Sequence, residues 1–212
     1  MAIFIAISCE RLDPRIEKGA VNLELGDFKR ARTHFEAVVD REPSNYAARL
    51  GLGKAMLQEF SAHPGDSMLL SDCITQFEAA RTLRPDKDVE KILSIVWFKR
   101  ATTLLAHDDT LAALGALSRS IGFDPNASKP VNLAGILYFH RGEKEKALNL
   151  FRLVITLDSC SVNGYFNAGM VHWADGDYAR AFDSWYKAAL RAPDDNEIVT
   201  WAAMAKKRIT AK

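Results

Sequence analysis

Residues 176–195 read GDYARAFDSWYKAALRAPDD, and the same pattern occurs twice earlier in the chain. Residues 26–45 read GDFKRARTHFEAVVDREPSN, and residues 142–161 read GEKEKALNLFRLVITLDSCS. Each stretch begins with Gly and a charged acidic residue, has Ala five residues after the Gly, an aromatic residue four further on, and a turn residue eight beyond that. A pattern that recurs at the same internal spacing indicates a repeat, and a repeat decides the fold before any site is considered.

The turn residues measure the period of this repeat. They are spaced 42, 40, 34 and 34 residues apart, at Pro43, Pro85, Pro125, Ser159 and Pro193. The two longer intervals indicate insertions. The first falls on residues 58–65, where a Pro-Gly pair predicts a lengthened loop. The second falls on residues 86–93, which contain no Gly or Pro and therefore predict a helix extended at its N-terminus.

Each unit divides into two helices, as its last copy shows. Before the Gly176 turn, one stripe of a first helix is formed at helical spacing by Tyr165, Ala168, Gly169 and His172. After the turn, the inner face of a second helix carries Ala181, Trp185 and Ala188. Two helices of one hairpin can approach closely only where side chains are small, and the aromatic ring fills the space beside that crossing.

This pattern resembles the tetratricopeptide repeat, a helix–turn–helix unit of about 34 residues. The resemblance covers residues 12–193 and implies an all-α, right-handed superhelical solenoid. The five units are expected at residues 12–45, 46–87, 88–127, 128–161 and 162–193. The last unit matches best, at Tyr165, Gly169, Gly176, Tyr178, Ala181, Trp185, Ala188 and Pro193. The third departs most, since Ala101 replaces the helix Gly and Asp108 replaces the turn Gly.

Residues 194–212 predict a C-terminal helix that caps the last unit. A terminal repeat needs such a cap because one face of it otherwise stays exposed. The acidic residues at 194 and 195 suit a helix N-terminus. One apolar stripe is expected to dock, formed by Ile198, Trp201, Ala202, Ala205 and Ile209.

Residues 1–11 form an apolar N-terminal segment, MAIFIAISCER, outside the repeats. We expect it to cover the first repeat or to dock on a partner. The alternative is membrane association through residues 1–9, including cleavage at Cys9 as in a bacterial envelope lipoprotein, although the segment lacks a basic start. The cysteines at 9, 73 and 160 show no CxxC spacing, so reduced thiols and a cytoplasmic location are favoured.

Composition and motifs exclude several classes of function. The 28 basic and 27 acidic residues leave a net charge of +1, which argues against nucleic-acid binding. No apolar run approaches the length of a membrane span. The phosphate-binding, dinucleotide-binding, nucleophile-elbow and zinc-protease motifs are missing, and the five histidines lack ligand spacing. We therefore expect no enzyme activity, no cofactor, no metal site and no small-molecule substrate.

The resemblance implies that the first helix of each unit lines a concave groove. The groove positions are Ile16, Ala20, Leu23, Leu50, Lys54, Leu57, Phe98, Thr102, Leu105, Asn132, Ile136, Phe139, Phe166, Met170 and Trp173. The candidate partner contacts are those of the C-terminal units: Phe98, Leu105, Asn132, Ile136, Phe139, Phe166, Met170 and Trp173. The alternative is that these side chains only pack between neighbouring helices.

The groove residues predict a protein–protein interaction scaffold that binds an amphipathic helix or an apolar extended peptide. Chaperone adaptors of the family hold a C-terminal carboxylate with a Lys–Asn pair on their first helices. The matching positions here hold Ile16 with Ala20, and Phe98 with Thr102, so that clamp is not expected. The alternative function is a structural subunit of a larger assembly, which includes a membrane-associated lipoprotein in envelope or secretion-system assembly.

Overall fold

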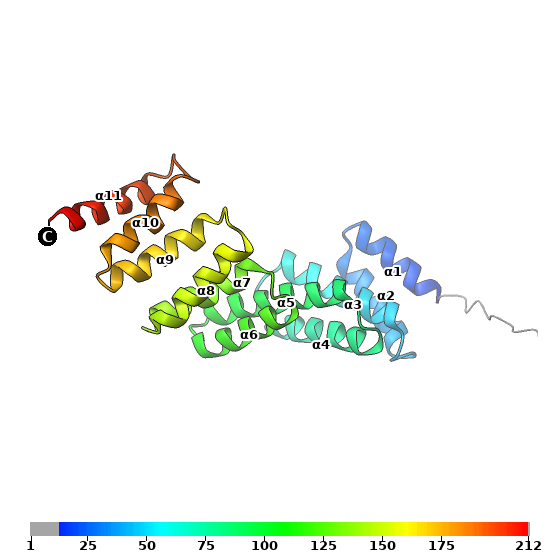
Figure 1. Cartoon of the computed structure of the whole chain (residues 1–212). Coiled ribbons are helices and arrows are strands. Elements are labelled where there is room, and N and C mark those ends of the chain that lie inside the picture. Colours follow the sequence, from blue (N-terminus) through cyan, green and yellow to red (C-terminus); the bar gives the residue numbers. More distant parts are fainter. Residues whose placement is uncertain (1–12, 212) are drawn as a thin grey trace, which may run out of the picture. The chain divides into compact units, whose positions relative to one another are not determined.

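The computed structural model describes residues 13–211, and this part of the chain consists of eleven α-helices without a strand (Figure 1). The helices are α1 (Pro14–Glu24), α2 (Phe28–Val39), α3 (Tyr46–Ala62), α4 (Ser67–Leu83), α5 (Lys87–Leu105), α6 (Thr110–Phe123), α7 (Ser128–His140), α8 (Lys144–Leu157), α9 (Val162–Ala174), α10 (Tyr178–Ala189) and α11 (Asn196–Thr210). The all-α fold class predicted from the sequence is confirmed. Residues 1–11, including Cys9, were predicted as an apolar segment and lie outside the described residues.

Tight turns join the two helices of a hairpin in the same way at several places. Gly26, Gly142 and Gly176 each adopt a positive φ of 74–78° after a first helix. Glycine suits this conformation because it has no Cβ to clash with the carbonyl. In the third hairpin Asp108 takes the same role with φ 60°, which the residue tolerates better than most non-glycine side chains.

Except for α8, the second helix of each hairpin starts with an N-terminus capped by an Asp side chain. The Asp27 carboxylate accepts a hydrogen bond from the backbone N–H of Arg30 at 3.1 Å, and Asp177 accepts one from Arg180 at 3.0 Å. Such a cap satisfies a backbone donor that the helix itself cannot, and contributes about 1 kcal/mol. The Gly-Asp pairs of the sequence pattern therefore encode the turn and the cap together, whereas Gly142-Glu143 encodes the turn alone.

Small residues and rings hold the two helices of a hairpin together, as the repeat pattern predicts. A glycine of the first helix faces an aromatic ring of the second so closely that an added Cβ would lie 2.5–3.0 Å from the ring. These pairs are Gly19 with Phe35, Gly53 with Phe77, Gly135 with Phe151, and Gly169 with Trp185. The rings are fully buried or nearly so, which makes these crossings the core of each hairpin.

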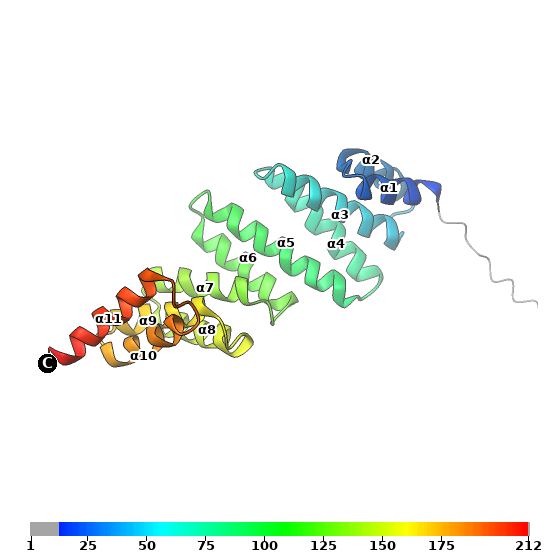
Figure 2. The same ribbon diagram turned by 90° about the horizontal axis from the view of Figure 1, so that it is seen from above.

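The chain divides into two compact units, with the division inside α5 between Val96 and Trp97. In the first unit, α2 packs against both α1 and α3, and α3 pairs with α4 (Figure 2). In the second unit, α7, α8, α9, α10 and α11 pack in chain order, and α6 contacts α7. Each unit thus buries its helices by contact between sequence neighbours, which is the packing of a helical repeat.

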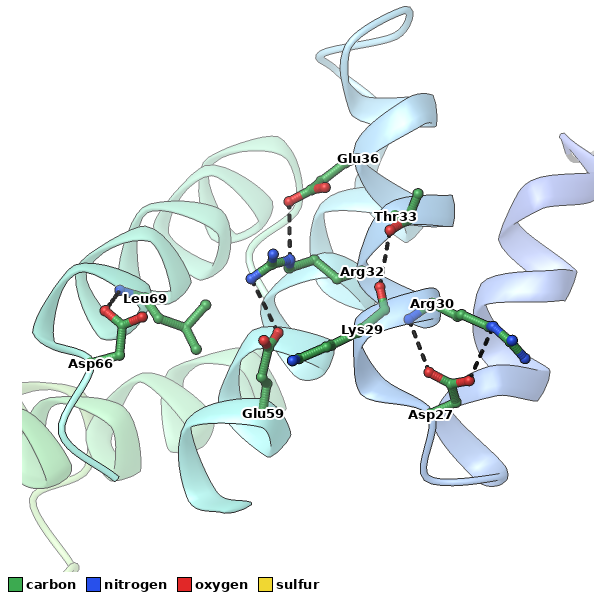
Figure 3. Close-up of polar contacts among 9 residues, drawn as sticks. All are labelled: Asp27, Lys29, Arg30, Arg32, Thr33, Glu36, Glu59, Asp66 and Leu69. Atoms are coloured by element: carbon green, nitrogen blue, oxygen red, sulfur yellow. Dashed lines mark hydrogen bonds and ion pairs between the residues drawn. The ribbon is translucent and has the colours of Figure 1, made fainter. Parts of the chain in front are cut away.

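The lengthened loop predicted at residues 58–65 is shorter than expected. Helix α3 continues to Ala62, because Phe60 is buried and Glu59 pairs with Arg32 of α2, so both residues have partners on helical faces. The turn starts at His63, and the Asp66 carboxylate caps α4 by accepting from the backbone N–H of Leu69 at 2.9 Å (Figure 3).

Helix α11 packs against α10, in the place where the sequence predicts a cap. Ile198, Ala202 and Ala205 are buried, and Trp201 is half-buried. Ile209 was expected on the same docking stripe but is 40% exposed. The docked part of the helix therefore ends at Ala205.

Candidate functional site

The first unit contains a cavity of about 590 Å³ bounded by residues of α1, α2, α3 and α5. Its apolar wall is formed by Leu23, Phe28, Leu57 and Ile92, all half-buried. Glu24 and Lys54 contribute one charge of each sign and are both exposed. A volume of this size is typical of protein sites that hold a small molecule or several side chains.

Three residues of this cavity, Leu23, Lys54 and Leu57, lie at groove positions that the repeat register assigns. None of them is among the eight candidate contacts, which lie in the aromatic-rich C-terminal units. The cavity depends equally on Phe28 of α2 and Ile92 of α5. These two residues lie outside the groove register, so the sequence carried no signal that they face Leu23 and Leu57.

An ion-pair network joins α2 to α3 in the first unit (Figure 3). The Arg32 guanidinium lies 3.1 Å from the Glu59 carboxylate through Nη1 and 3.4 Å from that of Glu36 through Nε. The Glu59 side chain is only 13% exposed, so its negative charge depends on Arg32 for compensation.

A second hollow of about 360 Å³ in the first unit lies beside the α1–α2 turn. Phe28 and Gly26 line both this hollow and the larger cavity. The smaller hollow is more polar, with Lys29, Glu59 and His63 among its lining residues. Phe28 therefore has free space on more than one side, which sets it apart from the tightly packed rings of the hairpin crossings.

The structure places the eight predicted contacts in the second unit, and all are half-buried. Apart from Asn132, they are distributed over three apolar clusters rather than one cavity. Phe98 and Leu105 pack beside Leu117 of α6, and Ile136 and Phe139 pack beside Phe151 of α8. The remaining apolar members, Phe166, Met170 and Trp173, pack beside Trp185 of α10.

Trp173 belongs to a group of rings that joins α9, α10 and α11. Its ring centre lies 4.9 Å from that of Tyr178, 5.7 Å from Trp185 and 6.0 Å from Trp201. Aromatic pairs at such distances stabilise a fold by about 0.5–1.5 kcal/mol beyond the area they bury. Trp173 therefore supports the docking of the C-terminal helix, whatever else it contacts.

Asn132 and Phe139 have a different setting on α7. The Asn132 side-chain oxygen accepts a hydrogen bond from the Asn167 amide of α9 at 2.9 Å, which links the two first helices. Phe139 contacts the ring of His140 with centres 6.0 Å apart. Neither residue takes part in the aromatic group around Trp173.

Several titratable groups have pKa values that are shifted by burial or by hydrogen bonds within the fold. Burial raises the pKa of the Cys73 thiol to about 12, and the thiol donates to the Gly53 carbonyl at 3.4 Å. Burial also lowers the pKa of His172. The backbone N–H of Asp88 and the Tyr46 hydroxyl together lower the pKa of Asp86. Among residues 13–211, no three His, Cys, Asp or Glu side chains are placed to hold a metal ion.

None of the helices between residues 13 and 211 combines the length and the apolar character that crossing a bilayer requires. The hairpins, their shared turns and their small-residue crossings define the class of the molecule. It is a helical-repeat protein built from helix–turn–helix units.

The comparisons with known proteins agree with this class. The family model described as the tetratricopeptide repeat matches residues 17–59 and 161–197. No protein of the curated set matches the sequence. Tetratricopeptide repeats are therefore present at residues 17–59 and 161–197, and the eleven helices of the described part fit about five such units and a C-terminal helix.

Solved structures show the same fold at low sequence identity. YrrB, a tetratricopeptide-repeat protein with an unusual peptide-binding site, is 19% identical, with 92% of this chain and 91% of YrrB covered and a TM-score of 0.58. MamA is 21% identical, with 84% of this chain and 96% of MamA covered and a TM-score of 0.57. The first repeat domain of Spaghetti, bound to the HSP90 peptide SRMEEVD, is 12% identical, covers 57% of this chain and 95% of its own, and has a TM-score of 0.54.

Proposed function

We propose that the chain is a non-enzymatic scaffold that binds a protein or peptide segment on the surface of its first helices. The observation that carries this proposal is the row of half-buried apolar side chains on α7 and α9, which are neither fully packed nor isolated. Partly exposed apolar side chains on neighbouring first helices are in keeping with an interaction site. Peptide binding by YrrB and by the Spaghetti repeat domain is in keeping with this use of the fold.

The chemistry of the row favours an apolar partner. Ile136, Phe139, Phe166 and Met170 offer no charge, and Met170 can adapt its shape to the bound side chain. Asn132 and Asn167 add an amide pair that can orient a backbone. An amphipathic helix or an extended apolar peptide fits this surface better than an acidic tail such as SRMEEVD.

Within the eight candidate residues, Phe139 is the sharpest test of partner contact. Trp173 and Phe166 lie within 5.7 and 6.3 Å of the buried Trp185 ring, so their truncation alters stability as well as any interface. Phe139 stands apart from that group. A central aromatic contact is worth about 2 kcal/mol or more, which corresponds to roughly a thirtyfold loss of affinity.

The experiment compares Phe139→Ala with Leu111→Ala in affinity purification from the native source, with quantitative mass spectrometry. Leu111 lies on α6 and is 70% exposed, so it is a matched control away from the first-helix surface. We expect Phe139→Ala to lose the partner that Leu111→Ala retains. Because Phe139 also packs against the cluster around Phe151, circular dichroism must show that the variant is folded at the temperature of the purification. Retention of every partner by Phe139→Ala would contradict the proposal.

The second candidate function is that of a structural subunit in a larger assembly. This alternative includes an assembly that is attached to a membrane. The exposed Leu111 on α6, a second helix of the second unit, favours contacts through the second-helix surface of that unit. The same purification distinguishes the two functions, because an assembly subunit would lose its neighbours with Leu111→Ala and keep them with Phe139→Ala.

A further inference from the structure

The cavity of the first unit is suited to a short uncharged apolar segment. Leu23, Phe28, Leu57 and Ile92 present half-buried apolar surface to it. The charges of Glu24 and Lys54 oppose each other, so neither an acidic nor a basic partner gains a net electrostatic advantage. Selection at this site therefore rests on apolar burial, worth about 25 cal/mol for each Å² removed from water.

A segment with this character precedes α1, which is itself one wall of the cavity. Residues 1–9 read MAIFIAISC and contain no charged side chain. Ile3, Phe4, Ile5 and Ile7 are large and apolar, whereas charges appear only at Glu10 and Arg11. The chemistry of residues 2–7 thus complements the cavity without any ion pair.

The length of this segment allows it to reach the cavity. Pro14 and Leu23 lie nine residues apart on α1, a rise of about 14 Å. Twelve residues can extend over roughly 40 Å. Four or five residues therefore suffice to return along α1, and residues 2–7 remain available at the cavity.

We propose that residues 2–7 of the same chain occupy the cavity formed by Leu23, Phe28, Leu57 and Ile92. A tethered segment is present at an effective concentration in the millimolar range, which favours it over a free peptide of equal affinity. The bound segment covers the first-helix surface of the first unit and leaves α7 and α9 of the second unit free. This inference is independent of the proposed partner surface, because the two sites share no residue.

The test places the photo-crosslinking residue p-benzoylphenylalanine at Phe4 of the full chain. Irradiation in dilute solution is followed by mass spectrometry of the crosslinked peptides. We expect crosslinks within one chain to the segments around Leu23, Leu57 and Ile92. Crosslinks only between chains, only to the second unit, or none within the chain would overturn the proposal.

Two variants with a matched control test the specificity of this contact. Leu57→Asp introduces a charge into the cavity wall, and Ile5→Asp introduces one into the segment while the cavity stays intact. Each should remove most of the intramolecular crosslink. Ile95→Asp is the control, because Ile95 lies on α5, is 52% exposed, and does not line the cavity. An Ile5→Asp chain that crosslinks as strongly as the parent would also overturn the proposal, and this outcome does not depend on whether Leu57→Asp folds.

Discussion

The indole ring of Trp185 on α10 lies directly against Gly169 on α9, in the space where a side chain at Gly169 would be. A Cβ at that position would lie 2.5 Å from the indole nitrogen. The same nitrogen donates a hydrogen bond to the Phe166 carbonyl at 3.0 Å. The glycine therefore makes room both for the ring and for the hydrogen bond that fixes its orientation.

Gly169→Ala should destabilise the second unit. Helix propensity alone would favour alanine by about 1 kcal/mol. The contact with Trp185 opposes this, since overpacking of a rigid, buried ring typically costs 1–3 kcal/mol and the ring cannot shift without losing its bond to Phe166. A net loss of up to about 2 kcal/mol is therefore expected in urea unfolding.

Gly115→Ala is the matched control for this prediction. Gly115 also lies inside a helix of the second unit, but an added Cβ would meet no atom within 4 Å. The propensity gain should therefore appear uncompensated, as a rise of about 0.5–1 kcal/mol in unfolding free energy. Equal effects of the two substitutions would show that the ring does not constrain Gly169.

Trp201→Asp should release the C-terminal helix from α10. The Trp201 ring lies 5.1 Å from Trp185 and 6.0 Å from Trp173, and a carboxylate there would lose both contacts and face an apolar seam. Truncation of a fully buried Trp costs about 3–5 kcal/mol, so about 2–3 kcal/mol is expected for this half-buried ring. Circular dichroism melting should show the loss. Met204→Asp, on the same helix but 44% exposed, should melt like the parent.

The two described cysteines should differ strongly in reactivity. A thiol reacts as its thiolate, and burial raises the pKa of Cys73 to about 12, whereas Cys160 is exposed after α8. In a Cys9→Ser background at pH 8, an aromatic disulfide reagent should modify Cys160 rapidly and Cys73 only after denaturation. Rapid modification of Cys73 in the folded chain would mean that α3 and α4 open readily.

His172 should make the second unit less stable in mild acid. Burial lowers its pKa below the ordinary value near 6.5, against the opposing effect of the Asp177 carboxylate. Its contribution is therefore fully present above about pH 6.5 and is lost as the pH falls toward the lower value of the folded state, since the unfolded chain binds the proton more strongly.

Chemical unfolding at pH 7.5 and 5.5 measures this effect. Between the two pH values, the parent should lose more unfolding free energy than His172→Gln does. The difference between the two losses should be less than about 1.4 kcal/mol for each pH unit. His107→Gln serves as the control because His107 is exposed in the turn after α5. An unchanged pH dependence in His172→Gln would assign the acid sensitivity to other groups.

Local chemistry explains why much of the fold could be predicted from the sequence. The turn at Gly176, the cap at Asp177 and the close approach of Gly169 to Trp185 each depend on residues near one another in the chain. Repetition of these residues makes the signal strong even where one unit departs from it. Asp108 shows this, because it adopts the turn conformation that glycine has elsewhere.

The sequence by itself determined the repeat, the helices and the pairing of small residues with rings, because each arises from contacts within one hairpin. The tertiary structure alone decided which first-helix side chains border open space. Leu23 and Leu57 line a cavity because Phe28 and Ile92, from other helices, complete its wall. The ring of Trp173, by contrast, packs against the rings of Trp185 and Trp201. The exposure of a side chain depends on every helix around it, and the periodicity of a single helix does not contain that information.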